Sequence, residues 1–282
     1  MRAFLAAILG LGAVAVSLFA IPAMWAERNI VNEDGYVELV SPLASDPDFQ
    51  TELARTLSDQ LVQNLGASGI GDVARAAIER VALKVSGLAG YEAAWEETQR
   101  SSHLAMFGDP AELPAELDQT NSFTVDIGPL GTLVTDAGNA SLPVTLTSPE
   151  QILVPVAGGA QPRMLAILRD LPPKAYTATA AAALLAAFSL LVARRWAAAL
   201  AWLGLGALIG AATLKLLTEA LLLGFVQDNA GASTLGGRLQ ELIIETATTS
   251  FDRWLVVLAI GGAVALGTGV VGRVLASRGA AA

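Results

Sequence analysis

The only histidine of the chain, His103, is the first residue whose type suits acid–base or metal chemistry. It lies in YEAAWEETQRSSHLAMFGD, where Glu96 and Arg100 precede it at helical spacing, so the three side chains fall near one face of a predicted helix. A carboxylate beside an imidazole can bind a metal or transfer protons. A zinc site, however, needs further ligands of matching geometry, and the sequence does not supply them.

A histidine in the last turn of a helix also interacts favourably with the helix dipole. The structural interpretation of His103 is therefore preferred, and His103, Glu96 and Arg100 are weak catalytic candidates. A pocket that gathered them with Asp109 or Asp126 would favour an enzyme. The chain lacks cysteine and a G-x-S-x-G motif, although a Ser–Lys arrangement stays open. GASGIGD lacks the Gly-Lys-Ser/Thr ending of a phosphate loop and predicts a turn. No metal or cofactor is expected.

A second pair of charged residues, Lys215 and Glu219, lies inside the apolar stretch TLKLLTEALLLGF. If the helix that contains them begins at Trp196, its first ~20 residues rise about 30 Å and cross the hydrocarbon core. Lys215 then reaches the outer boundary of the membrane, and Glu219 follows one turn later on the same face. The spacing predicts a charge pair at the membrane boundary, with an ion or proton relay as the alternative.

The composition predicts a membrane protein, because 54% of the residues are hydrophobic and only 15% are charged. Residues 1–25 form the first predicted span. Its apolar run is long for a signal peptide, so a retained anchor is expected, with cleavage as the alternative. Residues 26–173 form a separate domain. Residues 174–282 form a membrane domain with helices over 174–193, 196–226 and 254–272, and an outer loop with an amphipathic helix over 235–249.

The distribution of charge predicts the orientation of these spans. With both termini in the cytoplasm, the inner tips contain five arginines and no acidic residue, whereas residues 26–174 contain 21 acidic and nine basic residues. Residues 26–173 are therefore predicted to be extracytoplasmic, and the expected location is the plasma membrane. The net charge of −9 argues against a nucleic-acid partner.

Small residues predict where the spans pack against each other. Gly206 and Gly210 form a G-x-x-x-G motif in the third span, and Gly261, Ala265 and Gly269 form a stripe in the fourth. Such spacing permits close approach of helix backbones. Packing within one chain is preferred, and a homo-oligomer remains the alternative.

The predicted outer domain is mainly helical. Leucine and phenylalanine recur at helical spacing from Phe49 to Leu65, and further helices are expected over 70–85, 91–107 and 164–171. SFTVDI and LPVTLT read as short strands around a glycine-rich loop, GPLGTLVTDAG. The predicted fold class is thus a mainly α membrane protein: four transmembrane helices and an extracytoplasmic, predominantly helical domain with a small β element.

Three stretches resemble a group of integral membrane proteins from actinobacteria: DGYVELVSPLASDPDFQTELA, YEAAWEETQRSSHLAMFGD and FTVDIGPL. Members of this group have one N-terminal span, an extracytoplasmic domain and several C-terminal spans, and no assigned activity. The residues that carry the resemblance are Tyr36, Pro42, Leu43, Trp95, Arg100 and His103. The group often has Asn where this chain has Thr98 or Gln99, and its C-terminal loops differ. The resemblance implies the same topology and no catalytic role.

Three functions are compatible with these observations. The preferred one is a cell-envelope membrane protein whose outer domain acts as a binding, scaffold or accessory module, with a protein partner in the envelope and the lipid bilayer as its surroundings. A transporter or channel subunit is the first alternative, although the predicted spans offer few polar groups near the middle of the bilayer. An envelope hydrolase or transferase that uses His103, Glu96 and Arg100 is the second.

Overall fold

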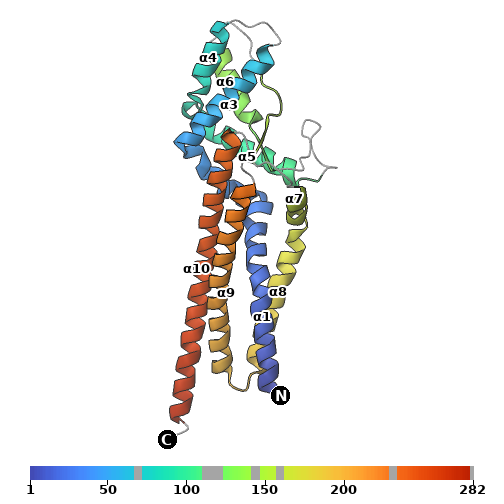
Figure 1. The fold of residues 1–282 in the computed structure, drawn as a ribbon, viewed down its shortest axis with the longest axis vertical. Coiled ribbons are helices and arrows are strands. Elements are labelled where there is room, and N and C mark those ends of the chain that lie inside the picture. The colour runs from blue at the N-terminus through green and yellow to red at the C-terminus, as the bar shows by residue number, and fades with distance from the viewer. Residues whose placement is uncertain (67–71, 110–122, 141–146, 157–161, 229–233, 280–282) are drawn as a thin grey trace. The chain divides into compact units, whose positions relative to one another are not determined.

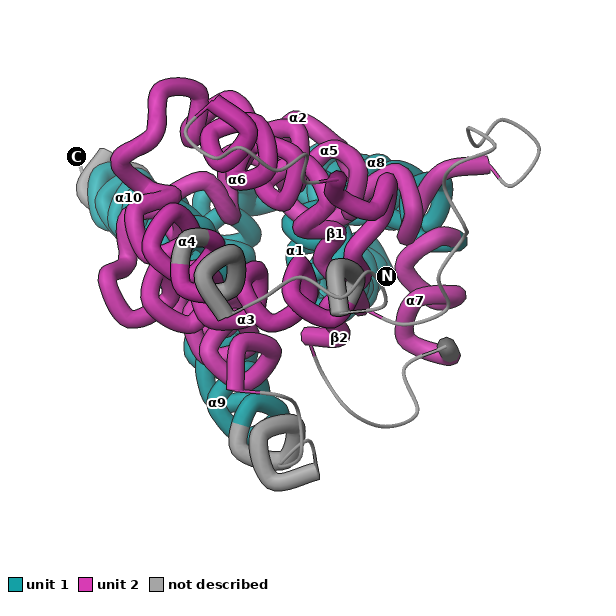
Figure 2. The backbone as a smooth tube through the Cα atoms, turned by 90° about the horizontal axis from the view of Figure 1, so that it is seen from above, with its two compact units in different colours: residues 1–28, 170–225, 247–282 teal, residues 29–169, 226–246 magenta. Residues whose placement is uncertain are grey.

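The computed structural model describes residues 1–66, 72–109, 123–140, 147–156, 162–228 and 234–279 (Figure 1). These residues are mostly helical and include one two-stranded sheet. They divide into two units, drawn in different colours in Figure 2. Unit 1 consists of residues 1–28, 170–225 and 247–282, and unit 2 of residues 29–169 and 226–246.

Unit 1 contains the long apolar helices of the chain. These are α1 (Arg2–Ala26), α8 (Leu171–Val192), most of α9 (Trp196–Asp228) and the later part of α10 (Thr234–Gly279). Four segments are long and apolar enough to cross a membrane: Arg2–Val31, Leu171–Val192, Trp196–Leu222 and Thr234–Leu275. In hydrocarbon a helix satisfies all its backbone hydrogen bonds internally, so helical structure is what such sequences require.

Glycines bring the helices of unit 1 close together. A Cβ added at Gly204 of α9 would lie 2.5 Å from the carbonyl oxygen of Gly262 on α10, and one at Gly269 would lie 2.5 Å from that of Ala197. On the other side of α9, a Cβ at Gly206 would lie 2.5 Å from a Val14 methyl group of α1. Backbones at such distances leave no room for a side chain, as is typical of packing through small residues.

The predicted packing stripe differs from this arrangement in detail. Gly206 and Gly269 lie at helix contacts, and a Cβ at Gly210 would lie 3.5 Å from Leu18. Ala265 is only partly buried, and a Cβ at Gly261 would meet nothing within 4 Å among the described residues. The adjacent Gly262 occupies the contact instead, because one position along a helix turns a side chain by about 100°.

The segment after residue 233 is one helix, whereas two were predicted. In place of separate helices over 235–249 and 254–272, α10 runs without interruption from Thr234 to Gly279. The intervening sequence, TATTSFDRW, contains neither proline nor glycine, so nothing in it ends a helix. The first turns of α10 belong to unit 2 and the remainder to unit 1.

The described part of unit 2 contains helices of 8–20 residues and two 3-10 turns. The helices are α2 (Glu33–Val40), α3 (Pro47–Gly66), α4 (Asp72–Ala82), α5 (Tyr91–Phe107), α6 (Gly128–Asn139) and α7 (Pro162–Arg169), with 3-10 turns at Ser41–Ser45 and Val85–Gly87. A π-helical turn, Glu27–Val31, precedes α2. The side chain of Asn32 caps α2 by accepting from Gly35 N at 3.0 Å, and that of Asp46 caps α3 by accepting from Phe49 N at 2.7 Å.

The sheet of unit 2 pairs β1 (Thr124–Asp126) with β2 (Leu153–Pro155) in antiparallel register, with Val125 opposite Val154. β1 lies within the predicted strand SFTVDI. The second predicted strand, LPVTLT, falls almost entirely outside the described residues. The predicted glycine-rich loop is the helix α6, because Pro129 starts it and Leu130 and Val134 recur at helical spacing on its buried side.

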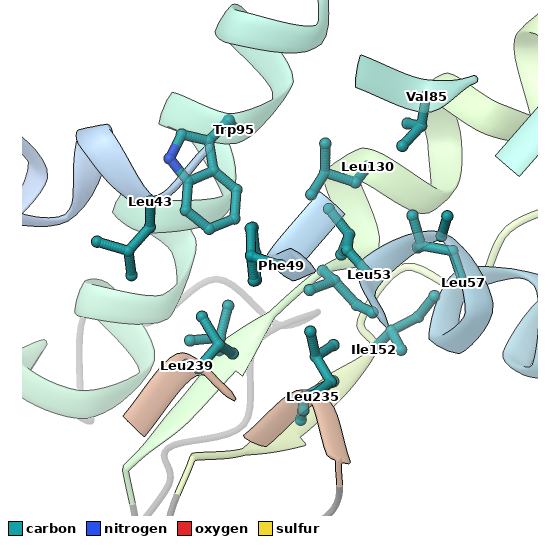
Figure 3. Close-up of a cluster of buried hydrophobic side chains, with 14 of the residues drawn as sticks. Leu43, Phe49, Leu53, Leu57, Val85, Trp95, Leu130, Ile152, Leu235 and Leu239 are labelled. Carbon is teal, nitrogen blue, oxygen red and sulfur yellow. The ribbon is translucent and has the colours of Figure 1, made fainter. Parts of the chain in front are cut away.

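The hydrophobic core of unit 2 draws on segments far apart in the sequence (Figure 3). Phe49 of α3 and Trp95 of α5 meet edge to face, with ring centroids 5.1 Å apart. Leu235 and Leu239, from the first turns of α10, are each 1% exposed in the same core. The fold of unit 2 therefore includes a segment that follows α9 in the sequence.

Candidate functional site

The strongest chemical candidate of the sequence, His103, is buried near the C-terminal end of α5. Its Nε2 lies 2.9 Å from the carbonyl oxygen of Val31, to which it donates. Its ring packs against Tyr36 and Phe107, with centroids 5.3 and 4.9 Å away. Burial lowers the pKa of His103 below its usual value, so the neutral ring is favoured. The histidine thus joins α5 to the start of α2.

Arg100 lies one turn before His103 and contacts the same region. Its guanidinium is 2.9 Å from Glu96 on α5 and 2.5 Å from Glu33 on α2. The hydrogen bonds that Arg100 donates to Glu96 and then to Glu33 raise its pKa above the ordinary value. The structure therefore brings Glu96, Arg100 and His103 to one side of α5, as their spacing predicts, and there Arg100 and His103 contact α2. We call these three residues with Glu33 the α5–α2 clasp.

Asp126 lies in a different environment, at the end of β1. The residue is 2% exposed. Its carboxylate accepts hydrogen bonds from the backbone nitrogens of Gly128 (3.0 Å) and Ile152 (2.9 Å) and from Ser101 Oγ (2.8 Å). Its own backbone nitrogen donates to Ser102 Oγ at 2.8 Å. Asp126 thus joins β1, β2 and α5. The described contacts do not link it to His103, and Asp109 is exposed after the end of α5.

The middle of α5 also carries buried polar atoms that sequence reasoning did not select. Trp95 Nε1, Thr98 Oγ1 and Gln99 Nε2 are buried and have no hydrogen-bond partner among the described residues. Buried polar atoms usually bond to protein or to ordered water, so these positions are suited to internal water molecules. In sequence they alternate with the clasp residues along α5, and Gln99, four positions before His103, lies on the same face as that histidine.

The charge pair predicted at the membrane boundary acquires a third member in unit 1. Lys215 Nζ is 3.6 Å from Glu219 Oε1 and 2.6 Å from Asp252 Oδ2 on α10. We call Lys215, Glu219 and Asp252 the boundary triad. Sequence spacing cannot reveal the contact with Asp252, which lies 37 residues further along the chain. The available signal was its position just before Trp254, where the fourth span was predicted to start.

Further polar contacts in unit 1 join the ends of other helices. Tyr176 of α8 donates from its hydroxyl to Glu27 Oε1 at 2.9 Å, and Trp25 of α1 donates from Nε1 to Ser250 Oγ on α10 at 3.2 Å. Glu27 is 8% exposed, and its other carboxylate oxygen is buried without a hydrogen bond among the described residues. Neither contact was predicted, because each joins residues more than 140 positions apart.

No known protein family matches the chain, and neither a curated protein nor a solved structure does. The resemblance to actinobacterial membrane proteins therefore depends only on the three stretches that suggested it. Four helices long and apolar enough to cross a membrane indicate a membrane protein. No group of three or more metal-ligating side chains occurs within the part of the chain that the structure describes.

Proposed function

We propose that this protein crosses the plasma membrane four times and holds unit 2 outside the cytoplasm, where it binds a protein partner of the cell envelope as a scaffold or accessory module. The observation that carries the proposal is the α5–α2 clasp. Arg100 and His103 are occupied in holding α5 to α2 and to the turn before α2, by contacts of 2.5 and 2.9 Å, and Glu96 is paired with Arg100. What unit 2 then offers to other molecules is its surface.

One part of that surface is suited to protein contact. Met164 and Ile167 of α7 are 50% and 53% exposed, while Leu165 between them is fully buried. Residues three apart lie side by side on a helix, so the two apolar side chains form a small anchor on an otherwise acidic domain. Interfaces commonly place a few apolar anchors within a polar rim. A partner that offers an apolar recess of matching shape fits this anchor, beside which Arg163 is exposed.

The proposed orientation has support from the distribution of charge. The predicted inner tips are basic, and unit 2 comprises most of the acidic residues of the chain. Because the chain has no cysteine, single introduced cysteines report accessibility without background. We expect a membrane-impermeant maleimide on intact cells to label Ser86→Cys, in an exposed turn of unit 2, and to label Ser277→Cys only after the cells are opened. The reverse pattern contradicts the orientation.

Partner binding is tested by a photo-crosslinking amino acid placed at Met164 or Ile167 in living cells. Ala166, which is exposed on another face of α7, is the matched control. We expect a discrete adduct with one other protein from both apolar positions and a much weaker one from Ala166. Adducts with lipid alone, or only with a second copy of the chain, would show that α7 does not bind an envelope protein.

A further inference from the structure

A cavity of about 1020 Å³ lies within unit 1, between α1, α9 and the turn that joins α8 to α9. It was not predicted from the sequence. Its wall is almost entirely apolar and is made largely of alanine, glycine, leucine and one tryptophan, Trp202. At one end the wall changes character, because Arg194 and Arg195 line it there.

The packing of the helices explains why the cavity exists. A Cβ at Gly10 of α1 would lie 3.7 Å from Leu203 of α9, and Val14 meets Gly206 one turn further along. α8 is held against α1 by Ser189, whose hydroxyl donates to the carbonyl oxygen of Ala6 at 2.9 Å. Nearer the N-terminus the facing side chains are alanines, Ala3 and Ala7 on α1 and Ala198 and Ala199 on α9, which are too small to fill the space.

The length of the cavity matches one leaflet of a bilayer. Its wall on α1 extends from Ala3 to Val14, about 17 Å at the rise of an α-helix. Half of a hydrocarbon core is about 15 Å thick. A lipid acyl chain that lies along this wall would therefore run from the membrane surface to near the midplane, with its polar end beside Arg194 and Arg195.

The positive charge of Arg194 and Arg195 at that end of the cavity favours an anionic ligand. Both arginine side chains are exposed, and neither has an ion pair among the residues that the structure describes. The adjoining chain end contributes another arginine, Arg2, and the sequence has no acidic residue in either 1–26 or 171–218. Guanidinium groups bind phosphate through paired hydrogen bonds, and basic pockets between spans bind anionic headgroups.

We propose that this cavity is a binding site for an anionic phospholipid, with an acyl chain between α1 and α9 and the phosphate at Arg194 and Arg195. The inference requires only that these helices cross a membrane. Assignment of the lipid to the cytoplasmic leaflet rests on the proposed orientation. The lipid fills space that the alanines leave empty, and it neutralises two unpaired cations.

The experiment uses the full-length protein in mild detergent micelles, where insertion orientation has no effect, and native mass spectrometry with added phosphatidylglycerol or phosphatidylcholine. We expect the unmodified chain to retain phosphatidylglycerol preferentially. Arg194→Gln with Arg195→Gln should lower that preference about tenfold or more, because each arginine near an anionic lipid surface contributes roughly fivefold. Arg273→Gln, which removes an arginine outside the cavity wall, is the matched control and should leave the preference unchanged.

A second variant tests the apolar part of the site. Ala7→Phe places a ring in the cavity and should reduce binding of both lipids without changing their ratio, whereas the arginine variants change the ratio. Equal retention of both lipids by the unmodified chain, or equal effects of Arg273→Gln and the double variant, would overturn the proposal. Because neither topology nor a protein partner enters this measurement, its failure is separate from failure of the proposed function.

Discussion

Asp126 offers the sharpest test of how unit 2 is held together. Its carboxylate accepts two buried backbone N–H groups, from Gly128 and Ile152, and one hydroxyl, from Ser101. Asp126→Ala leaves both N–H groups without an acceptor, and an unsatisfied buried donor costs about 1–3 kcal/mol. We therefore expect a loss of about 2–6 kcal/mol in the free energy of unfolding of unit 2. For a domain with a total of about 5–15 kcal/mol, such a loss is large.

Asp126→Asn separates the two parts of this effect. The amide oxygen of asparagine still accepts from Gly128 and Ile152, and its nitrogen can donate to Ser101 in place of accepting from it. Only the additional strength of bonds to a charged acceptor is lost. We expect the asparagine variant to lose about 1–3 kcal/mol, clearly less than the alanine variant. Asp136→Ala, which removes an exposed carboxylate from α6, is the control and should change little.

The assay is the alkylation rate of a cysteine at Ser58, in the full chain in micelles. Ser58 is 5% exposed in α3, its hydroxyl has no hydrogen bond among the described residues, and the chain has no other thiol. A buried thiol reacts only when the domain opens, so the rate reports the free energy of opening. A loss of about 3 kcal/mol accelerates labelling by roughly a hundredfold. If Asp126→Ala accelerates it no more than Asp136→Ala, the carboxylate does not support unit 2.

Three further predictions concern the clasp, the boundary triad and the spans. Burial lowers the pKa of His103, so as pH falls below about 6.5 the unfolded chain takes up a proton before the folded one does, and unit 2 should lose stability. The labelling rate of Ser58→Cys should therefore depend less on pH in His103→Gln than in the unmodified background. An unchanged pH dependence would exclude His103 as its source. Lys215→Leu should lower the temperature of aggregation in micelles more than Asp252→Leu does. The first variant leaves two carboxylates without their cation, whereas the second leaves Lys215 paired with Glu219. Equal effects would show that Lys215 does not hold both carboxylates. Gly204→Ala should cost about 1–3 kcal/mol in detergent-induced unfolding, because its Cβ meets the Gly262 carbonyl oxygen, whereas Gly261→Ala, with no neighbour within 4 Å, should be neutral or slightly stabilising.

Much of the fold was accessible from the sequence because its signals are local. The four apolar segments and the leucine stripe that starts at Phe49 each depend on neighbouring residues. α6 was missed because Gly131 and Gly138 resemble loop residues, although both are buried in helix. Gly131 lies so close to Ser148 that its Cβ would clash, at 2.5 Å. Gly131 therefore serves packing, and a single sequence does not distinguish that role from flexibility.

In the candidate site, too, the local relations could be predicted from the sequence and the long-range contacts could not. The proximity of Glu96, Arg100 and His103 follows from helical spacing and is present in the structure. Their partners Glu33 and Val31, 67 and 72 positions away, decide what the residues do, and no local pattern contains that information. The acceptor role of Asp126 depends likewise on Ile152, across the β1–β2 pair. Residue type therefore predicted which side chains are capable of chemistry. Their tertiary contacts show that these groups hold helices and strands together.

The boundary triad also bears on whether charge within an apolar helix implies transport. Lys215 lies 19 residues after the start of α9, about 29 Å along the helix axis, and so near the far edge of a hydrocarbon core that begins at Trp196. The adjacent Leu214 packs with Phe251 and Leu255 of α10 in an apolar cluster, while Lys215 meets Asp252. Side chains change from apolar to ionic within one residue on both helices. A relay across the bilayer would require further ionisable groups on the midplane side of Lys215, and α9 has none between Trp196 and Leu214. On this ground the prediction of a membrane boundary at the triad is preferred to that of a relay.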